Sequence, residues 1–208
     1  MNEKPWTFEP YNREVWNKSN TRVMFVGADP NDNNPKINKK TGREVRDMGE
    51  WFKQAPKNDY FNNLKFYNRI KIMLEGVLPN EDRPFDHMRY VDFKASPGVS
   101  KAKTEDVMNY VRGNHKIVSK YFQGEDRPNI VILTGGHAKI VYFKSKKENL
   151  IDYDGATKFV CLPHPSFRGS NDNLISASTE ILDRLMPTSS NKLWKWSPKK
   201  NEWALLTK

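Results

Sequence analysis

The sequence lacks several features that would mark particular classes of protein. Among its 208 residues there is one cysteine, Cys161, which excludes an internal disulfide and a cluster of thiolate metal ligands. Its apolar runs are short and residues 1–5 are polar, so neither a membrane-spanning helix nor a signal peptide is predicted. The glycine patterns of dinucleotide-binding and Walker loops are also missing. These absences predict a soluble, cytoplasmic protein with no membrane partner.

Acidic residues are scarce relative to basic ones. The chain has 25 aspartates and glutamates against 35 lysines and arginines, a formal net charge of +10. Such an excess favours a polyanionic partner, with nucleic acid as the first candidate. A solvated basic surface that binds nothing specific has the same composition, so charge alone does not decide between the two. The length fits a single domain over residues 1–208.

Four short apolar runs predict the buried parallel strands of an α/β protein. They cover residues 22–26, 88–93, 129–134 and 158–162. Between and after them, apolar residues recur at helical spacing over 66–77, 107–122 and 174–185, the second stretch following Thr104 as a candidate cap. The alternation predicts a three-layer α/β/α fold with a central, mainly four-stranded parallel sheet. Cys161 lies within the last predicted strand, which indicates a buried, inert thiol.

Two regions do not fit this alternation. Residues 31–58 are polar and predict a long loop over the strand edge, which is either functional or merely solvated. The tryptophan-rich segment 193–208 predicts a hairpin appendage. Its tryptophans either stack on bases or, as we favour, cover the core from the side.

Two motifs at the ends of predicted strands contain chemically suggestive residues. Gly27-Ala28-Asp29-Pro30 follows the first strand, and His164-Pro165-Ser166 follows the last. Loops after parallel strands converge on one edge of the sheet, so Asp29 and His164 are expected to face one pocket. A carboxylate and an imidazole placed in this way form a plausible hydrolytic pair. A structural turn and a structural histidine are the simpler interpretations.

In order and spacing, the two motifs resemble those of the uracil-DNA glycosylase superfamily. Residues 90–94 occupy the place of that family's base-reading strand, and residues 130–136 that of a strand ending in glycine. The resemblance spans roughly residues 22–185. It implies a monofunctional DNA N-glycosylase that flips a base out of DNA and hydrolyses its N-glycosidic bond, leaving an abasic site. It further implies a monomer that needs no metal and no cofactor.

The resemblance also implies roles for individual residues. Asp29 would stabilise the oxocarbenium-like sugar and orient a water molecule, while His164 would donate to the departing base. Ala28 and Phe61 match base-binding positions, Phe61 as the stacking aromatic, although an ordinary core phenylalanine would look the same. Positions matched to DNA contacts, including the phosphate contact and the wedge that replaces a flipped base, are Pro165, Ser166, Phe167 and Arg168.

Departures from the family pattern concern the substrate. The uracil-specific branch has a tyrosine after its Asp-Pro pair, which blocks substituents at the pyrimidine 5 position, but this chain has Asn31. The counterpart of that branch's base-reading asparagine is Asp92, whose carboxylate suits the amine of cytosine better than the O4 of uracil. A structural acid at a strand end is the alternative for Asp92. The departures favour a 5-substituted cytosine of modified phage DNA, and hence antiviral defence.

The sequence is also compatible with other functions. Within the enzyme class, the alternative is uracil or mismatch repair. Outside it, a catalytically silent protein could bind DNA or a nucleotide as a sensor, although the presence of both Asp29 and His164 argues against silence. A Rossmann-like nucleotide-binding enzyme is disfavoured because residues 135–139 lack its glycine pattern. The expected partner is double- or single-stranded DNA.

Overall fold

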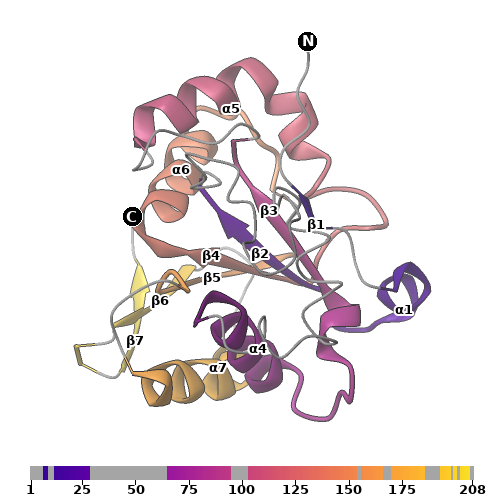
Figure 1. Ribbon diagram of the computed structural model, residues 1–208. Coiled ribbons are helices and arrows are strands. Elements are labelled where there is room, and N and C mark those ends of the chain that lie inside the picture. The colour runs from indigo at the N-terminus through magenta and orange to yellow at the C-terminus, as the bar shows by residue number, and fades with distance from the viewer. Residues whose placement is uncertain are drawn as a thin grey trace, which may run out of the picture.

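A central β-sheet with helices on both faces forms the framework of the protein (Figure 1). A computed structural model describes residues 7–8, 12–28, 65–94, 103–153, 156–165, 170–185, 193–197, 199–200 and 202–206. The described elements are β1 (Thr7–Phe8), α1 (Arg13–Lys18), β2 (Val23–Gly27), α4 (Lys65–Val77), the 3₁₀ helix η2 (Pro84–His87), β3 (Met88–Asp92), α5 (Thr104–Ser119), β4 (Ile130–Thr134), α6 (Gly135–Lys147), β5 (Lys158–Leu162), α7 (Asn171–Leu185), β6 (Leu193–Ser197) and β7 (Glu202–Leu206). The predicted three-layer α/β/α fold is confirmed.

The strands of the described residues are ordered β1-β3-β2-β4-β5-β6-β7 across the sheet. The four strands predicted from apolar runs, β3, β2, β4 and β5, pair in parallel at its centre. β6 adds a further parallel strand beside β5, and β1 and β7 pair antiparallel at the two edges. The sheet is wider than the four strands predicted. The additional strands, at and near the edges, were not predicted as part of it because they lack the continuous apolar runs that identify strands buried on both faces.

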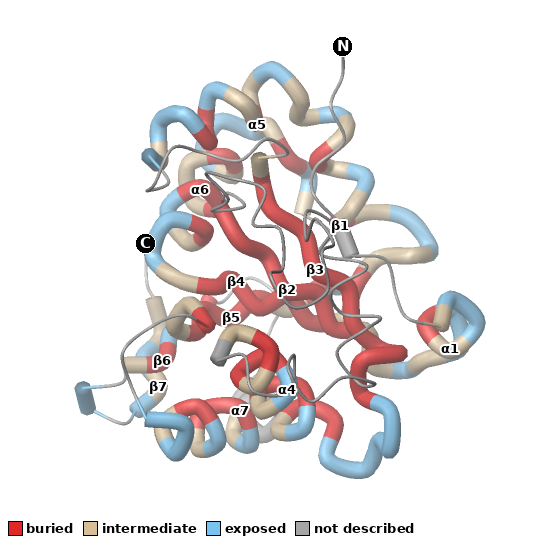
Figure 2. The backbone as a smooth tube through the Cα atoms, viewed as in Figure 1, coloured by how far each residue is buried: buried red, intermediate tan, exposed pale blue. Residues whose placement is uncertain are grey.

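Both faces of the central strands are buried (Figure 2). In β2, Val23 and Phe25 belong to the apolar cluster made with α4 and α7, whereas Met24 and Val26 belong to the cluster made with α5 and α6. A strand covered on both sides has no polar face, which explains its uninterrupted apolar sequence. Cys161 lies in the second cluster, where burial raises the pKa of its thiol to about 12. The thiol is therefore protonated and inert at neutral pH, as predicted.

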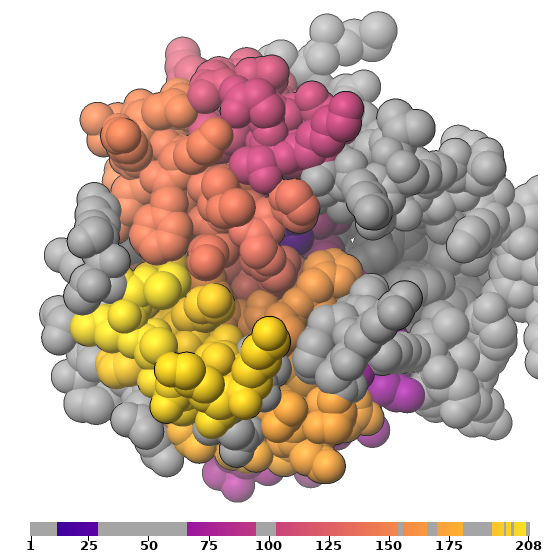
Figure 3. Space-filling view, turned by 90° about the vertical axis from the view of Figure 1, so that its left-hand side faces the viewer, coloured from indigo at the N-terminus to yellow at the C-terminus, as the bar shows by residue number. Residues whose placement is uncertain are grey.

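The tryptophan-rich C-terminal segment forms the predicted hairpin from β6 and β7. β6 also pairs with β5, so the hairpin continues the central sheet, and Figure 3 shows it at the surface between α6 and α7. Trp196 is 1% exposed within the α4–α7 cluster, and Trp194 and Trp203 pack against that cluster. The tryptophans therefore cover the core from the side.

The start of α5 differs from the sequence-based expectation. Thr104 is the first helical residue of α5 and not its cap; the N-cap is Lys103, which makes no capping hydrogen bond through its side chain. The Thr104 hydroxyl instead hydrogen-bonds Nδ1 of His137 at 2.8 Å.

α6 begins at Gly135, directly after β4. Its sequence predicted no helix because its apolar residues do not form a single stripe.

Candidate functional site

The carboxyl ends of β3, β2, β4 and β5 form one edge of the sheet because these strands run parallel. Gly27 at the end of β2 is in register with Asp92 at the end of β3. The ladder continues one step further, since the amides of Phe93 and Lys94 donate to the carbonyls of Gly27 and Ala28 at 3.1 and 3.2 Å. β4 alone separates β2 from β5, so their ends lie about 10 Å apart.

A buried acid lies at this edge beside the glycine of the first motif. Asp92 is 3% exposed, and its Oδ1 accepts a hydrogen bond from the hydroxyl of Tyr90 at 3.5 Å. Burial, and then the charge of Asp92, raise the pKa of Tyr90 well above its usual value, so the phenol keeps its proton as a donor. A Cβ at Gly27 would lie 2.0 Å from Asp92 Oδ1 and 2.6 Å from the Tyr90 hydroxyl oxygen. Gly27 thus leaves the space that both side chains occupy.

His164 lies two residues beyond β5 and is partly buried. A Cβ at Gly135 would lie 3.1 Å from its Cβ, and Gly135 has a φ of +84°, which favours glycine. Burial lowers the pKa of His164 below its ordinary value. The imidazole is therefore neutral at neutral pH, with one nitrogen as donor and the other as acceptor. The donor nitrogen of a neutral imidazole can stabilise a departing anion through one hydrogen bond.

α4 contributes two side chains that the sequence did not identify as part of a site. Phe66 contacts the rings of both Tyr90 and His164, each at a centroid distance of 5.9 Å. Arg69, one turn later, is 2% exposed and donates from Nη1 to the carbonyl of Pro165 at 3.1 Å. Helical spacing indicated only that Phe66 belongs to the core. The position of α4 in the chain could have indicated the site, because a helix that follows a parallel strand begins near the carboxyl edge of the sheet.

The structure therefore brings part of the predicted site together. Ala28 and Asp92 lie at adjacent strand ends, and His164 and Pro165 follow β5 at the same edge. The remaining predicted residues lie outside the described residues: Asp29, Asn31, Phe61, Ser166, Phe167 and Arg168, with the loop 31–58. The pairing of Asp29 with His164 stays a prediction.

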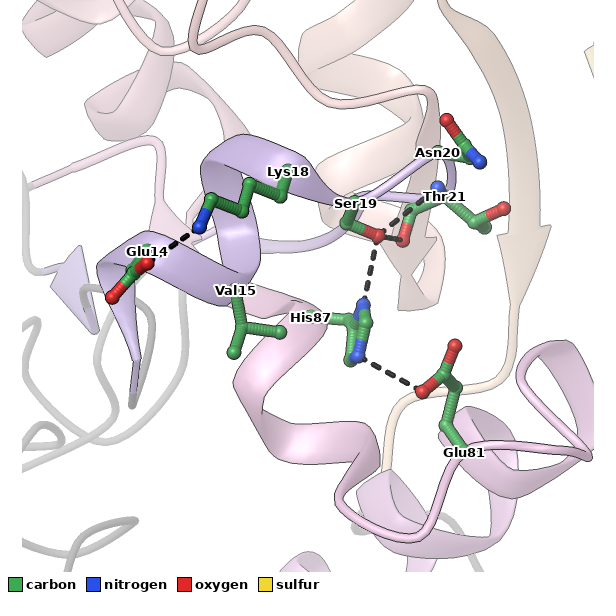
Figure 4. A pocket seen from close by; sticks show the side chains of 8 residues that line it. All are labelled: Glu14, Val15, Lys18, Ser19, Asn20, Thr21, Glu81 and His87. Atoms are coloured by element: carbon green, nitrogen blue, oxygen red, sulfur yellow. Dashed lines mark hydrogen bonds and ion pairs between the residues drawn. The ribbon is translucent and has the colours of Figure 1, made fainter.

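A separate hollow of about 560 Å³ lies near the opposite, amino ends of β2 and β3 (Figure 4). A hydrogen bond of 2.8 Å joins Nδ1 of His87, in its wall, and the Ser19 hydroxyl, and Nε2 of His87 lies 3.2 Å from Glu81 Oε2. The Ser19 hydroxyl also contacts the carbonyl and amide of Thr21. These polar groups are thus already occupied by protein partners, and the four described site residues do not line this hollow.

Within the described residues, no three His, Cys, Asp or Glu side chains are grouped so that they could hold a metal ion. The helices seen in this part of the chain are too short or too polar to cross a lipid bilayer. Comparisons of the sequence with protein-family models and with curated proteins give no match.

Replacing Gly27 with alanine is expected to destabilise the protein by roughly 1–3 kcal/mol, the usual cost of overpacking a core. The new methyl group would displace the Asp92 carboxylate and the Tyr90 hydroxyl. Chemical denaturation of the variant measures the effect, with Gly113→Ala as the matched control. Gly113 is exposed in α5, with open space where a Cβ would stand, so that change should be neutral or slightly stabilising. Equal stabilities for the two variants would contradict the packing argument.

The neutral His164 predicts a loss of stability at acid pH. Its pKa is lowered in the folded protein, while the unfolded chain has the ordinary value of about 6.5. Between these two values the unfolded chain binds more protons, so the free energy of unfolding falls as the pH falls below about 6.5. His164→Gln should weaken this pH dependence, as measured by urea denaturation between about pH 7 and 5. If wild type and variant show the same slope, His164 is not the group responsible.

Proposed function

We propose that the protein is a monofunctional DNA glycosylase that flips a base out of DNA and hydrolyses its N-glycosidic bond. The supporting observation is the convergence of Asp92, Phe66 and His164 at the carboxyl edge of a parallel sheet, where α/β proteins bind ligands. Asp29 follows Ala28 directly in the sequence, and Ala28 lies at that edge. We propose that the enzyme acts on DNA as a cytoplasmic monomer and needs no metal or cofactor. Its net charge of +10 suits the negatively charged phosphates of DNA.

The two motifs suggest how the chemistry is divided. Bond cleavage leaves positive charge on the sugar and negative charge on the departing base. The Asp29 carboxylate stabilises the sugar cation and orients a water molecule. The water adds to the anomeric carbon and gives one proton to that carboxylate, while the bond to the base breaks and the base leaves as an anion. His164 donates a hydrogen bond to the base as negative charge accumulates on it. Phe66 supplies an apolar aromatic wall next to the imidazole, which excludes water and strengthens that hydrogen bond.

Asp92 suggests the type of base. Its Oδ1 accepts from the Tyr90 hydroxyl, and a carboxylate can accept several hydrogen bonds through its two oxygens. An ionised carboxylate accepts hydrogen bonds and donates none, so it suits the 4-amino group of cytosine and repels the 4-carbonyl of uracil. Asn31 in place of a blocking tyrosine would leave room at the pyrimidine 5 position. We therefore propose a 5-substituted cytosine, as in modified phage DNA, as the substrate in antiviral defence.

The test is incubation of the protein with matched oligonucleotides that carry cytosine, 5-substituted cytosines or uracil. Alkaline treatment then cleaves the strand wherever a base has been released. Cleavage at a modified cytosine, about a hundredfold slower or more for His164→Ala, is the expected result. An absence of cleavage on all duplex and single-stranded substrates would remove the glycosylase proposal and favour a silent DNA-binding protein.

Asp92→Asn is expected to shift base preference towards uracil. The amide can donate to a carbonyl at position 4, and each such base-edge hydrogen bond contributes roughly 1–3 kcal/mol of discrimination. The ratio of single-turnover rates on uracil and on substituted cytosine should therefore rise about tenfold or more. Asp86→Asn, a change at another buried acid but before β3, is the matched control. Efficient uracil release by wild type, with no activity on cytosines, would instead identify a repair enzyme.

A further inference from the structure

Arg69 is a buried cation beside the candidate site. Its surface is 2% exposed, whereas arginine is almost never fully buried unless it is paired with hydrogen-bonding or charged groups. Its Nη1 donates to the carbonyl of Pro165 at 3.1 Å, and its Nε donates to Oδ1 of Asn171 at 3.2 Å. One guanidinium thus holds two points of the chain that lie in different elements.

One acceptor lies within the second motif and the other lies after it. Pro165 directly follows His164, and Asn171 is the first residue of α7. The same helix that carries Arg69 also places Phe66 against the His164 ring, with the centroids 5.9 Å apart. α4 therefore contacts both the imidazole and the peptide that follows it. The carbonyl of Pro165 cannot shift without breaking a buried charge-assisted hydrogen bond.

The shape of the side chain explains why this position is an arginine. A guanidinium is a rigid plane with donors that point in fixed, separate directions, so it can hold two acceptors of different segments at once. A lysine at position 69 would bring a single ammonium group on a flexible stem. It would keep the charge but could not fix the carbonyl of Pro165 and the side chain of Asn171 together.

We propose that Arg69 is a positioning residue that holds His164 in the orientation required for base release. The inference rests on the proposed function for the reaction that it assists. Misplacing a catalytic group by about 1 Å can cost about a hundredfold in rate. Arg69 should therefore affect the chemical step, while DNA contacts made elsewhere on the protein remain unchanged.

The test combines kinetics with the protonation of His164. Arg69→Lys is expected to lower the single-turnover rate of base release about tenfold or more, with DNA affinity changed less than about threefold. In the same variant, the pKa of the His164 imidazole, followed by NMR, should rise towards its ordinary value as the loosened loop admits water. Arg89→Lys is the matched control, because Arg89 is 4% exposed but lies over the ring of Trp16.

Each outcome is decisive. An unchanged rate and an unchanged His164 pKa in Arg69→Lys would overturn the proposal. If wild type releases no base, the proposed function fails, yet a shifted His164 pKa would still show that Arg69 positions the histidine. Should Arg69→Lys not fold, Asn171→Ala removes one acceptor from an exposed helix start and must produce the same changes in smaller measure.

Discussion

Replacing Asp29 with asparagine is expected to abolish base release while leaving DNA binding almost unchanged. The carboxylate interacts with a positive charge that develops on the sugar only as the glycosidic bond breaks, so it stabilises the transition state more than the bound substrate. A neutral amide of the same size cannot provide that charge. Loss of one such electrostatic contribution typically costs about 10² to 10³ in rate, and here the ability to orient water is lost as well. Single-turnover assays at saturating enzyme measure the rate of base release.

The control for this experiment is Asp152→Asn, an exposed aspartate between α6 and β5. It removes the same charge from the protein and should change neither the rate nor the affinity for DNA. Affinity is measured separately by titration of labelled oligonucleotide at fixed salt, because binding of this kind varies steeply with ionic strength. A wild-type rate for Asp29→Asn would remove the residue from the mechanism and leave the Asp-Pro pair as a structural turn.

His164→Ala is expected to lower the rate of base release about a hundredfold or more, as loss of one donor to a developing oxyanion does. The neutral imidazole stands against Phe66, where reduced access of water strengthens a hydrogen bond to the departing base. The single-turnover rate should fall while the affinity for DNA stays close to that of wild type. His164→Gln retains a side-chain N–H donor and should keep part of the activity that alanine loses.

His115→Ala provides the comparison for the His164 variants, because His115 lies on α5 and bonds the backbone of its own helix. This variant should release base at the wild-type rate. A rate for His164→Ala within about threefold of wild type would show that the histidine is structural. Thermal unfolding of all three variants separates a catalytic effect from a loss of fold.

Most of the fold could be predicted from the sequence because a strand buried on both faces has a continuous run of apolar residues. The runs at 22–26, 88–93, 129–134 and 158–162 correspond to β2, β3, β4 and β5, with ends shifted by one residue at most. α4 and α7 also matched their apolar stripes. α6 was missed because its apolar residues are not spaced as one stripe, and the added width of the sheet was missed because β1 and β6 pair without such runs.

The candidate site divides in the same way between sequence and tertiary structure. Asp92 and His164 could be predicted from the sequence because the first lies near the end of a predicted strand, the second follows one, and parallel strands bring their ends to one edge. Phe66, Arg69 and the space left by Gly27 could not, since each depends on which side chains meet across separate elements. Residue order specifies which groups reach the edge of the sheet. Distances, burial and the lowered pKa of His164 arise only when helix, strand and loop pack together and exclude water.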